Sequence, residues 1–438
     1  MTSEILSRPA SFRELLRFAF PLMIGQLGMM MIGAGDVLIA TEHSTSALAA
    51  IGIAVAFCNP VFVVGMAFIM PVSPLVAKRR GEAKDTDHLA LSALVYSFLL
   101  SIPFMFLTWL TSYLVPFMNY EPEITKIVIE YIEITAWSMP GIFVYMSLKE
   151  WLQAHERTTW ATVVSILAVV INLGLNRGFT FGMYGLPDMG VNGLAWASLS
   201  VRYILGLAMF IPLMTKIVRT HYLDRGFLKE TFILGAPTAV SMFFEVMAFC
   251  SVTLFVGKFG QTQTAANNLA LTIASMTFMI PLALSSAVGV KVGHAYGERN
   301  PIMIRRFAWT GLVCSLVFMA CSALTFSLFP HQLLGAFGAS SEVVDYGVRL
   351  IFWVAIFQIF DGAQVTLGSI LRAIGIARPV TIITFIGYWV IGIPLGWWLG
   401  NRMGYQGQGF WIGLATSLGL VSLALYILTA YKVKHAVE

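Results

Sequence analysis

Apolar runs of about 20 residues or more recur twelve times along this chain, and few charged residues interrupt them. A run of that length is long enough for a helix to cross the hydrocarbon core of a bilayer. The hydrophobic share of 58% and the mean hydropathy of +0.80 exceed what a soluble fold hides in its interior. Barrel strands would need short alternating segments, which the sequence lacks. The sequence therefore predicts an all-α polytopic membrane protein with twelve transmembrane helices.

The positive charges indicate which way the chain is inserted. The segments on one side of the twelve spans hold 21 Lys and Arg, whereas those on the other side hold four. Because Lys and Arg concentrate in cytoplasmic loops, we expect both termini in the cytoplasm of a bacterial-type inner membrane. The net charge of +5 then reflects topology, and we expect no nucleic-acid partner. The predicted spans are 17–41, 46–76, 89–113, 124–149, 159–181, 191–216, 229–257, 264–293, 304–329, 343–373, 379–400 and 408–431.

The sequence predicts neither a cleaved signal peptide nor disulfide bonds between its cysteines. The first run is too long for the core of a signal peptide, and it contains Asp36. The cysteines lie in apolar runs without CxxC spacing, which predicts small core residues in place of disulfides or metal ligands. These residues are Cys58, Cys250, Cys314 and Cys321.

The two halves of the chain repeat each other. Matching residues keep an offset of 216 in the early spans and of 219 to 220 in the later ones. Each half has an even number of spans, so the copies have the same orientation and a pseudo-twofold axis along the membrane normal should relate them. Transporters that rock two lobes around a central site are built in this way. Matching pairs include Pro21 with Pro237, Gly81-Glu82 with Gly297-Glu298, and Gly193-Leu194-Ala195 with Gly413-Leu414-Ala415.

The longest basic connection marks the boundary between the halves. It reads TKIVRTHYLDRGFLKE, from Thr215 to Glu230. The predicted organisation is therefore an N-terminal six-helix lobe over 1–214, a cytoplasmic linker over 215–230 and a C-terminal six-helix lobe over 231–438.

Three acidic residues inside the spans do not follow the repeat. A carboxyl group at such depth is costly and indicates function by default. Acids that belong to the scaffold should be duplicated with it, so unduplicated acids indicate chemistry added to each lobe separately. Asp36 matches Val252, Glu245 matches Met29, and Asp361 matches Tyr145 or Ile142, depending on the offset.

Two polar residues of the fifth span lie at the same predicted depth as Asp36 in the first span. Asn172 and Asn176 in the fifth span are one helical turn apart and share a face. One carboxylate and two amide oxygens form a candidate site for Na⁺ or for a proton. Gln26 lies on the face of Asp36. The alternative for the asparagines is interhelical hydrogen bonding.

The tenth span carries a polar stripe on an otherwise apolar helix. Gln358, Asp361, Gln364 and Gly368 follow one another at spacings of three, three and four residues, on one face. Glu245 in the seventh span has a similar predicted depth, so the two acids can share a cavity. Burial and a like charge both disfavour an ionised carboxyl group, which is the property that a proton-coupled carrier needs. The alternative is a permanently protonated acid that fixes helix packing.

Other residues are weaker candidates for the walls of a cavity. Met276, Phe357 and Tyr388 are aromatic or soft side chains that suit a flat cationic ligand, although such residues at helical spacing are usually core. Ser241 shares a helical face with Glu245, and Arg202 in the sixth span is a candidate partner for an acid.

Over essentially its whole length the chain resembles the multidrug and toxic compound extrusion (MATE) transporters. The resemblance rests on MIGAGDV in the first span, NLGLN in the fifth, FFEV in the seventh and FDGAQVTLGSILRAIG in the tenth. The pairing of Glu245 with Asp361 makes the chain similar to the NorM-like branch. The family implies cation-coupled antiport without a cofactor: entry of Na⁺ or H⁺ drives export of lipophilic, mostly cationic compounds by alternating access.

The resemblance also implies roles for individual residues. Phe357 departs from the pattern, because some NorM-like proteins have a Tyr one turn before the acid of the tenth span. This removes an oxygen ligand, and the choice between Na⁺ and H⁺ stays open. The implied cation sites contain Asp36, Asn172 and Asn176 with Ser198 as a looser match in the first lobe, and Glu245 with Asp361 in the second.

Two other functions compete with antiport. A lipid-linked saccharide flippase of the same superfamily would be expected to line its cavity with arginines, whereas this set is mostly acidic. A membrane lipid-modifying enzyme would need a catalytic cluster at an interface, and the seven histidines are scattered. A P-loop motif is absent, so ATP is not expected as the energy source. We expect a transporter that is not an enzyme and that acts as a monomer in the bilayer.

Overall fold

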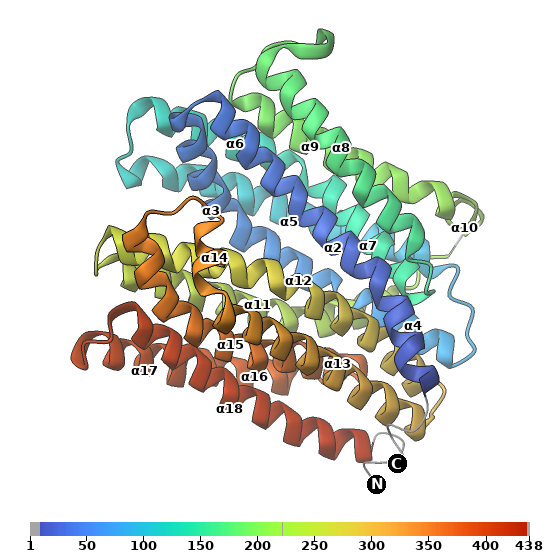
Figure 1. Ribbon diagram of the computed structural model, residues 1–438. Helices are drawn as coiled ribbons and strands as arrows, with labels where there is room; N and C mark the ends of the chain where they lie inside the picture. Colours follow the sequence, from blue (N-terminus) through green and yellow to red (C-terminus); the bar gives the residue numbers. More distant parts are fainter. Residues whose placement is uncertain (1–8, 221, 436–438) are drawn as a thin grey trace. The chain divides into compact units, whose positions relative to one another are not determined.

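The computed structural model describes residues 9–220 and 222–435, and within these ranges it contains helices and no strand (Figure 1). In this part of the chain eleven helices are long and apolar enough to cross a membrane, and one bent pair makes a twelfth span. The predicted all-α polytopic class is confirmed. The helices are α2 (Pro9–His43), α3 (Thr45–Ile69), α4 (Val72–Gly81), α5 (Leu89–Thr111), η1 (Ser112–Met118), α6 (Pro122–Trp137), α7 (Met139–Ala154), α8 (Thr159–Phe181), η2 (Met183–Gly185), α9 (Asn192–Phe210), η3 (Ile211–Leu213), α10 (Met214–Arg219), α11 (Arg225–Gly257), α12 (Gln261–Gly297), α13 (Pro301–Leu328), α14 (Pro330–Gly335), α15 (Ser341–Ala373), α16 (Arg378–Phe385), η4 (Ile386–Gly392), α17 (Ile393–Trp397), η5 (Trp398–Arg402) and α18 (Gln406–Lys434).

The fourth span is broken where the sequence predicted one continuous helix over 124–149. α6 and α7 meet at 43°. The break falls at Ser138, and Pro140 occupies the first turn of α7, where its missing N–H leaves no hydrogen bond unmade. Arg202 of α9 donates to the Ser138 hydroxyl at 2.6 Å, which ties the break to a neighbouring span.

The eleventh span is also irregular. Between α16 and α18 the backbone passes through two π-helical segments, Ile386–Gly392 and Trp398–Arg402. Such segments are rare and often occur at functional sites. The first of them contains Tyr388, whose side chain is fully buried.

Contacts divide the chain into two compact units. The Asp36 unit comprises Ile24–Arg80 and Lys84–Ala239. The Asp361 unit contains α2 up to Met23, the short stretch Gly81–Ala83, and the chain from Val240 onward. Helices α2 and α11 therefore contribute to both units, whereas the predicted lobes begin and end in loops. The lobe boundaries stay predictions.

Each unit repeats the packing of the other. In the Asp36 unit α7 packs against α5 and α9, and in the Asp361 unit α15 packs against α13 and α18. Matching glycines make close backbone approaches in both units. A Cβ atom on Gly193 would lie 2.5 Å from the Phe179 backbone, and one on Gly413 would lie 2.5 Å from the Gly392 carbonyl oxygen. The matched Gly-Leu-Ala triplets thus bring helix backbones together in both units.

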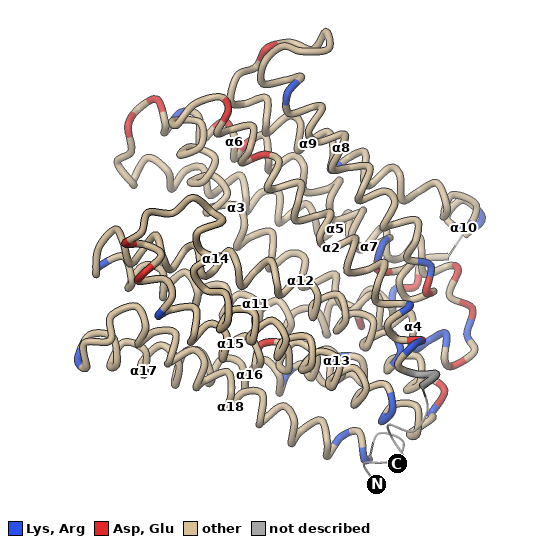
Figure 2. Tube along the Cα trace, viewed as in Figure 1, with Lys and Arg blue, Asp and Glu red and all other residues tan. Residues whose placement is uncertain are grey.

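The predicted linker lies within the Asp36 unit and is held there by charge. Lys and Arg gather near α4 and α10 (Figure 2). Asp224 caps α11 by accepting from the Phe227 N–H at 2.8 Å, and Arg79 of α4 pairs with both Asp224 and Glu230. Burial acts to raise the pKa of Asp224, but the Phe227 N–H and the Arg79 guanidinium outweigh it and hold the pKa below its usual value.

The cysteines match their prediction only in part. All four are free; Cys58 is buried and Cys314 is half-buried, but Cys250 and Cys321 are exposed. A thiol on the outer face of a spanning helix meets hydrocarbon, so it needs no place in the core.

Gly193→Ala and Gly413→Ala are each expected to destabilise the protein, because the added methyl group would lie 2.5 Å from backbone atoms. Overpacking of this kind costs about 1–3 kcal/mol. The measurement is the midpoint of thermal unfolding of the purified full chain in detergent.

Gly174→Ala on α8 is the matched control, since no neighbouring atom lies within 4 Å of its Cβ position. Alanine also favours a helix by about 1 kcal/mol over glycine, so this variant should not lower the midpoint. Equal midpoints for the three variants would contradict the close backbone contacts.

Candidate functional site

Asp36 lies at the centre of a hydrogen-bond network in the Asp36 unit. Its Oδ1 accepts from Asn176 Nδ2 at 2.7 Å and from Asn172 Nδ2 at 3.2 Å, and its Oδ2 accepts from Ser198 Oγ at 2.8 Å. All four side chains are buried. Three donors stabilise an ionised carboxylate. The structure therefore brings together the four residues that the resemblance placed in the first lobe.

Local geometry explains why these groups meet. Asn172 and Asn176 are one turn apart on α8, and Asn176 Nδ2 also donates to Asn172 Oδ1 at 3.1 Å. On α2 the residue before Asp36 is a glycine, and a Cβ there would lie 3.1 Å from Asn172 Oδ1. A larger residue at Gly35 would press on the side chains of Asn172 and Leu173, so the glycine favours this close approach of α2 to α8.

One acceptor of this network has no donor. The Oδ1 atom of Asn176 is buried and receives no hydrogen bond from any residue that the structure describes. Leaving a buried polar atom unsatisfied costs about 1–3 kcal/mol. An amide oxygen beside a carboxylate is the kind of ligand that hard cations take. The donor set therefore fits a small cation such as Na⁺.

Arg202 is the nearest positive charge to this network. It lies one turn after Ser198 on α9, bonds the Ser138 hydroxyl, and packs over the Phe62 ring with 5.5 Å to the centroid. Its charge attracts the Asp36 carboxylate. Arg202 makes no direct hydrogen bond to Asp36 in the described structure, so its role as a partner for an acid or as a cavity residue stays a prediction.

Glu245 on α11 and Asp361 on α15 form a second acidic pair, in the Asp361 unit. Their carboxyl groups are close enough to repel each other when ionised. Glu245 Oε2 accepts a single long bond, from Gln364 Nε2 at 3.4 Å. Among the described residues none donates a hydrogen bond to Asp361, which is 8% exposed. This pair therefore lacks the donors that surround Asp36.

Neutral oxygens without partners surround the acidic pair. The Oε1 atoms of Gln358 and Gln364 and the hydroxyl of Tyr388 are buried and unpaired within the described chain. Gln358 uses its Nε2 to donate to the Ala274 carbonyl at 3.1 Å. Within residues 9–220 and 222–435, no three His, Cys, Asp or Glu side chains group as a metal site. Two carboxylates with amide and phenol oxygens suit a proton or a monovalent cation.

Arg372, at the end of the predicted tenth span, also lies near this pair, although it was not among the predicted site residues. It lies on α15 eleven residues after Asp361, and its charge attracts Glu245. Gly368 leaves room for it: a Cβ atom there would lie 3.1 Å from Arg372 Nη1. The sequence contained a sign of this role, because Arg372 lies four residues after Gly368 and continues the polar stripe of the tenth span.

The structure separates the other candidates. Phe357 is only 2% exposed and packs edge-on against Phe249 and Trp411, so it lies in the core. Met276 is exposed and lines a separate pocket of ≈ 500 Å³ with residues of α13 and α14. Phe357 packs as its core interpretation expects, and contact of either side chain with a transported compound stays a prediction.

Two polar candidates lie on the helices that carry acids. Ser241 is buried one turn before Glu245 on α11, and Gln26 is half-buried on α2, ten residues before Asp36. Their contact with a transported compound stays a prediction.

Comparisons with known proteins agree with this arrangement. The MatE family model matches residues 21–177 and 237–398. The chain is 32% identical over 432 residues to the probable multidrug resistance protein NorM of Mesorhizobium japonicum, covering 94% of this chain and 92% of that protein. It is 26% identical over 433 residues to the multidrug resistance protein NorM of Photobacterium profundum, with 94% of each covered.

A solved structure shares the fold. The outward-facing conformation of a multidrug resistance MATE family transporter of the MOP superfamily matches with a TM-score of 0.89. The match covers 98% of this chain and 97% of that one at 18% identity, so it shows the fold alone.

Tyr388→Phe is expected to leave stability unchanged or to raise it, because the buried hydroxyl faces the Gln364 side chain without a hydrogen bond of good geometry. The gain is up to the desolvation penalty of about 1–3 kcal/mol. Thermal unfolding of the purified chain in detergent measures it.

Tyr96→Phe is the matched control, since that buried hydroxyl donates to the Phe68 carbonyl at 3.0 Å. Its loss should cost about 0.5–1.5 kcal/mol. If Tyr388→Phe destabilised the protein as much as Tyr96→Phe, the hydroxyl of Tyr388 would have a partner after all.

Proposed function

This chain belongs to the MatE family, and we propose that it is a NorM-like multidrug efflux antiporter of a bacterial inner membrane. Relatives named as NorM multidrug resistance proteins support export of small drug-like compounds. In this proposal entry of Na⁺ or H⁺ drives the export of lipophilic, mostly cationic compounds. In this proposal the protein is a transporter, so its site residues bind and release ions instead of catalysing a reaction.

The Glu245–Asp361 pair carries the proposal of cation coupling. Two ionised carboxylates with one hydrogen bond of 3.4 Å are unfavourable in an apolar bundle. A proton or a sodium ion removes the repulsion, and a cationic compound at the same acids would do so as well. Competition between the two cations for one acidic pair links the entry of one to the exit of the other.

The driving force depends on the charge of the exported compound. When a neutral compound leaves, one positive charge that moves inward across 100 mV releases about 2.3 kcal/mol. At about 1.36 kcal/mol per tenfold ratio, this sustains a gradient of about 50-fold. When a monocationic compound leaves in exchange for one cation, no net charge moves, and the concentration gradient of Na⁺ or H⁺ drives efflux.

We assign the Asp36 network as a second cation site. The unpaired Asn176 oxygen supports this role, because it adjoins the carboxylate. Here a cation would be held by carboxylate and amide oxygens that are already in position.

Asp361→Asn and Glu245→Gln are each expected to abolish cation-driven efflux, because each removes one of the two charges for which the cations compete. The assay is ethidium efflux from vesicles that contain the purified chain. Sodium and pH gradients are imposed separately, and the gradient that drives efflux identifies the coupling ion.

Asp345→Asn is the matched control, an exposed acid near the other end of α15, and it should leave efflux unchanged. Thermal unfolding checks that all three variants are folded. Efflux at the unmodified rate in both Asp361→Asn and Glu245→Gln would refute the coupling role.

A further inference from the structure

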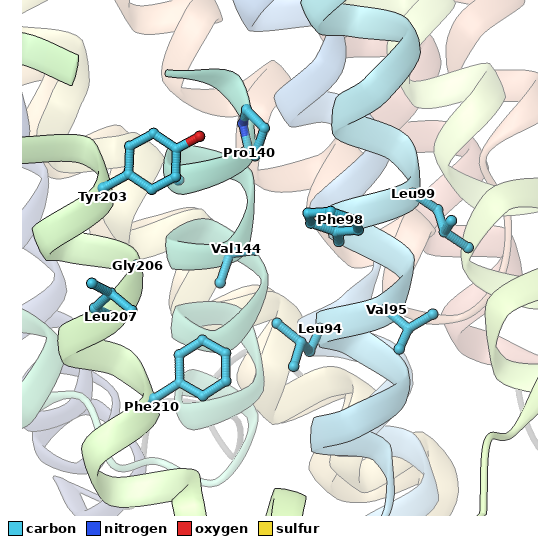
Figure 3. A pocket seen from close by; sticks show the side chains of 11 residues that line it. Leu94, Val95, Phe98, Leu99, Pro140, Val144, Tyr203, Gly206, Leu207 and Phe210 are labelled. Atoms are coloured by element: carbon cyan, nitrogen blue, oxygen red, sulfur yellow. The ribbon is translucent and has the colours of Figure 1, made fainter. Parts of the chain in front are cut away.

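A groove in the Asp36 unit has no part in the acidic sites. It runs between α5 and α9 over the first turns of α7, with a volume of ≈ 410 Å³ (Figure 3). Gly141 and Gly206 form part of its lining. A Cβ atom on Gly206 would lie 2.8 Å from the Gly141 carbonyl oxygen, so the two backbones touch. The lack of side chains there keeps the space between α5 and α9 open.

The groove offers a ligand nothing but hydrocarbon and aromatic surface. Tyr203 brings the only polar side-chain group in the lining, and its hydroxyl already donates to the Trp137 carbonyl at 3.0 Å. Figure 3 shows Phe98 and Leu99 on one helix and Leu207 on another. All three are more than half exposed. A cationic drug would find no acceptor here, whereas a hydrocarbon chain would be fully compatible.

On the side predicted to be cytoplasmic, the groove reaches the end of α9. Its last lining residue on α9 is Phe210, where the helix ends. Close by, the half-exposed Trp160 donates its indole N–H to the Ala208 carbonyl at 3.1 Å. Tryptophan in such a position marks the level of the lipid headgroups.

Basic residues lie on the short helix that follows the end of α9. The short helix α10 comes directly after η3, and it exposes the apolar side chains of Met214 and Val218. It also carries Lys216, which pairs with Asp87, and the exposed Arg219. In the described chain Arg219 forms no ion pair. An apolar groove that ends beside an unneutralised guanidinium is complementary to a lipid with a negative headgroup.

We propose that this groove binds one acyl chain of an anionic phospholipid of the cytoplasmic leaflet, with the lipid phosphate beside Arg219. The apolar lining favours a hydrocarbon chain, and the positive charge of Arg219 favours a negatively charged headgroup. Because each basic residue near the surface contributes about a fivefold preference for anionic lipid, a phosphatidylglycerol should bind about five times more tightly than a phosphatidylcholine with the same chains.

Native mass spectrometry of the purified full chain measures both affinities. Arg219→Gln should remove the preference for phosphatidylglycerol and leave the phosphatidylcholine affinity unchanged. Arg378→Gln is the matched control, because Arg378 is an exposed arginine of the Asp361 unit that forms no ion pair among the described residues. That control should keep the fivefold preference.

A second pair of variants tests the groove itself. Val144→Trp fills it and should lower both affinities about tenfold or more, since several methylene groups lose their contacts. Leu423→Trp, at an exposed position on α18, should change neither. If Val144→Trp does not fold, Leu207→Gln at the exposed rim replaces it, with a loss of both affinities expected.

Four results would overturn the proposal. The first is equal affinity of the unmodified chain for the two lipids, and the second is unchanged lipid binding in the filled groove. The third is a chain that dimerises through this face, seen as a dimer that Val144→Trp dissociates. Displacement of the lipid by ethidium at a one-to-one ratio would likewise assign the groove to the transported compound. None of these measurements depends on transport, so a failure of the lipid proposal can be distinguished from a failure of the proposed efflux function.

Discussion

The chemistry of this protein depends on how carboxyl groups are accommodated inside an apolar helical bundle. An ionised carboxylate there is unfavourable unless hydrogen bonds or a positive charge compensate it. Asp36 meets this condition with three donors from α8 and α9. Glu245 accepts one long bond from Gln364, and none of the described residues donates to Asp361. The Asp36 carboxylate is therefore hydrogen-bonded within the fold, although Asn176 Oδ1 beside it is unpaired, whereas the second pair lacks such donors.

The repeat explains why two units with the same packing hold such different sites. Gly193 and Gly413 both make close backbone contacts in their units, so the scaffold was duplicated together with these approaches. Each acidic site, by contrast, uses positions that are apolar or aromatic in the other copy. Packing depends on volume, which the repeat preserves; charge depends on single residues, which change independently.

The sequence predicted the features that follow from average hydropathy over a span and from the spacing of residues along a helix. Hydropathy over about 20 residues gives the spans, and a spacing of four residues brought Asn172 and Asn176 to Asp36. The break at Ser138 was missed, although Pro140 signals a helix start. The place of Phe357 could not be known, because spacing does not reveal that Trp411 covers that face. The π-helical turn that buries Tyr388 depends on tertiary packing and leaves no local pattern.

Counting charge separates the two sites further. Arg202 lies near Asp36, and Arg372 lies near Glu245. If all three acids are ionised, Asp36 and Arg202 sum to zero, whereas Glu245 and Asp361 with Arg372 sum to one negative charge. A neutral set is favoured in a low dielectric, so one proton or one sodium ion would restore neutrality at the second site. Under the proposed coupling we therefore expect the energy of the Glu245–Asp361 site to change more with cation binding than that of the Asp36 network. A conformational change that responds to a bound cation would then depend more on the Glu245–Asp361 site than on Asp36.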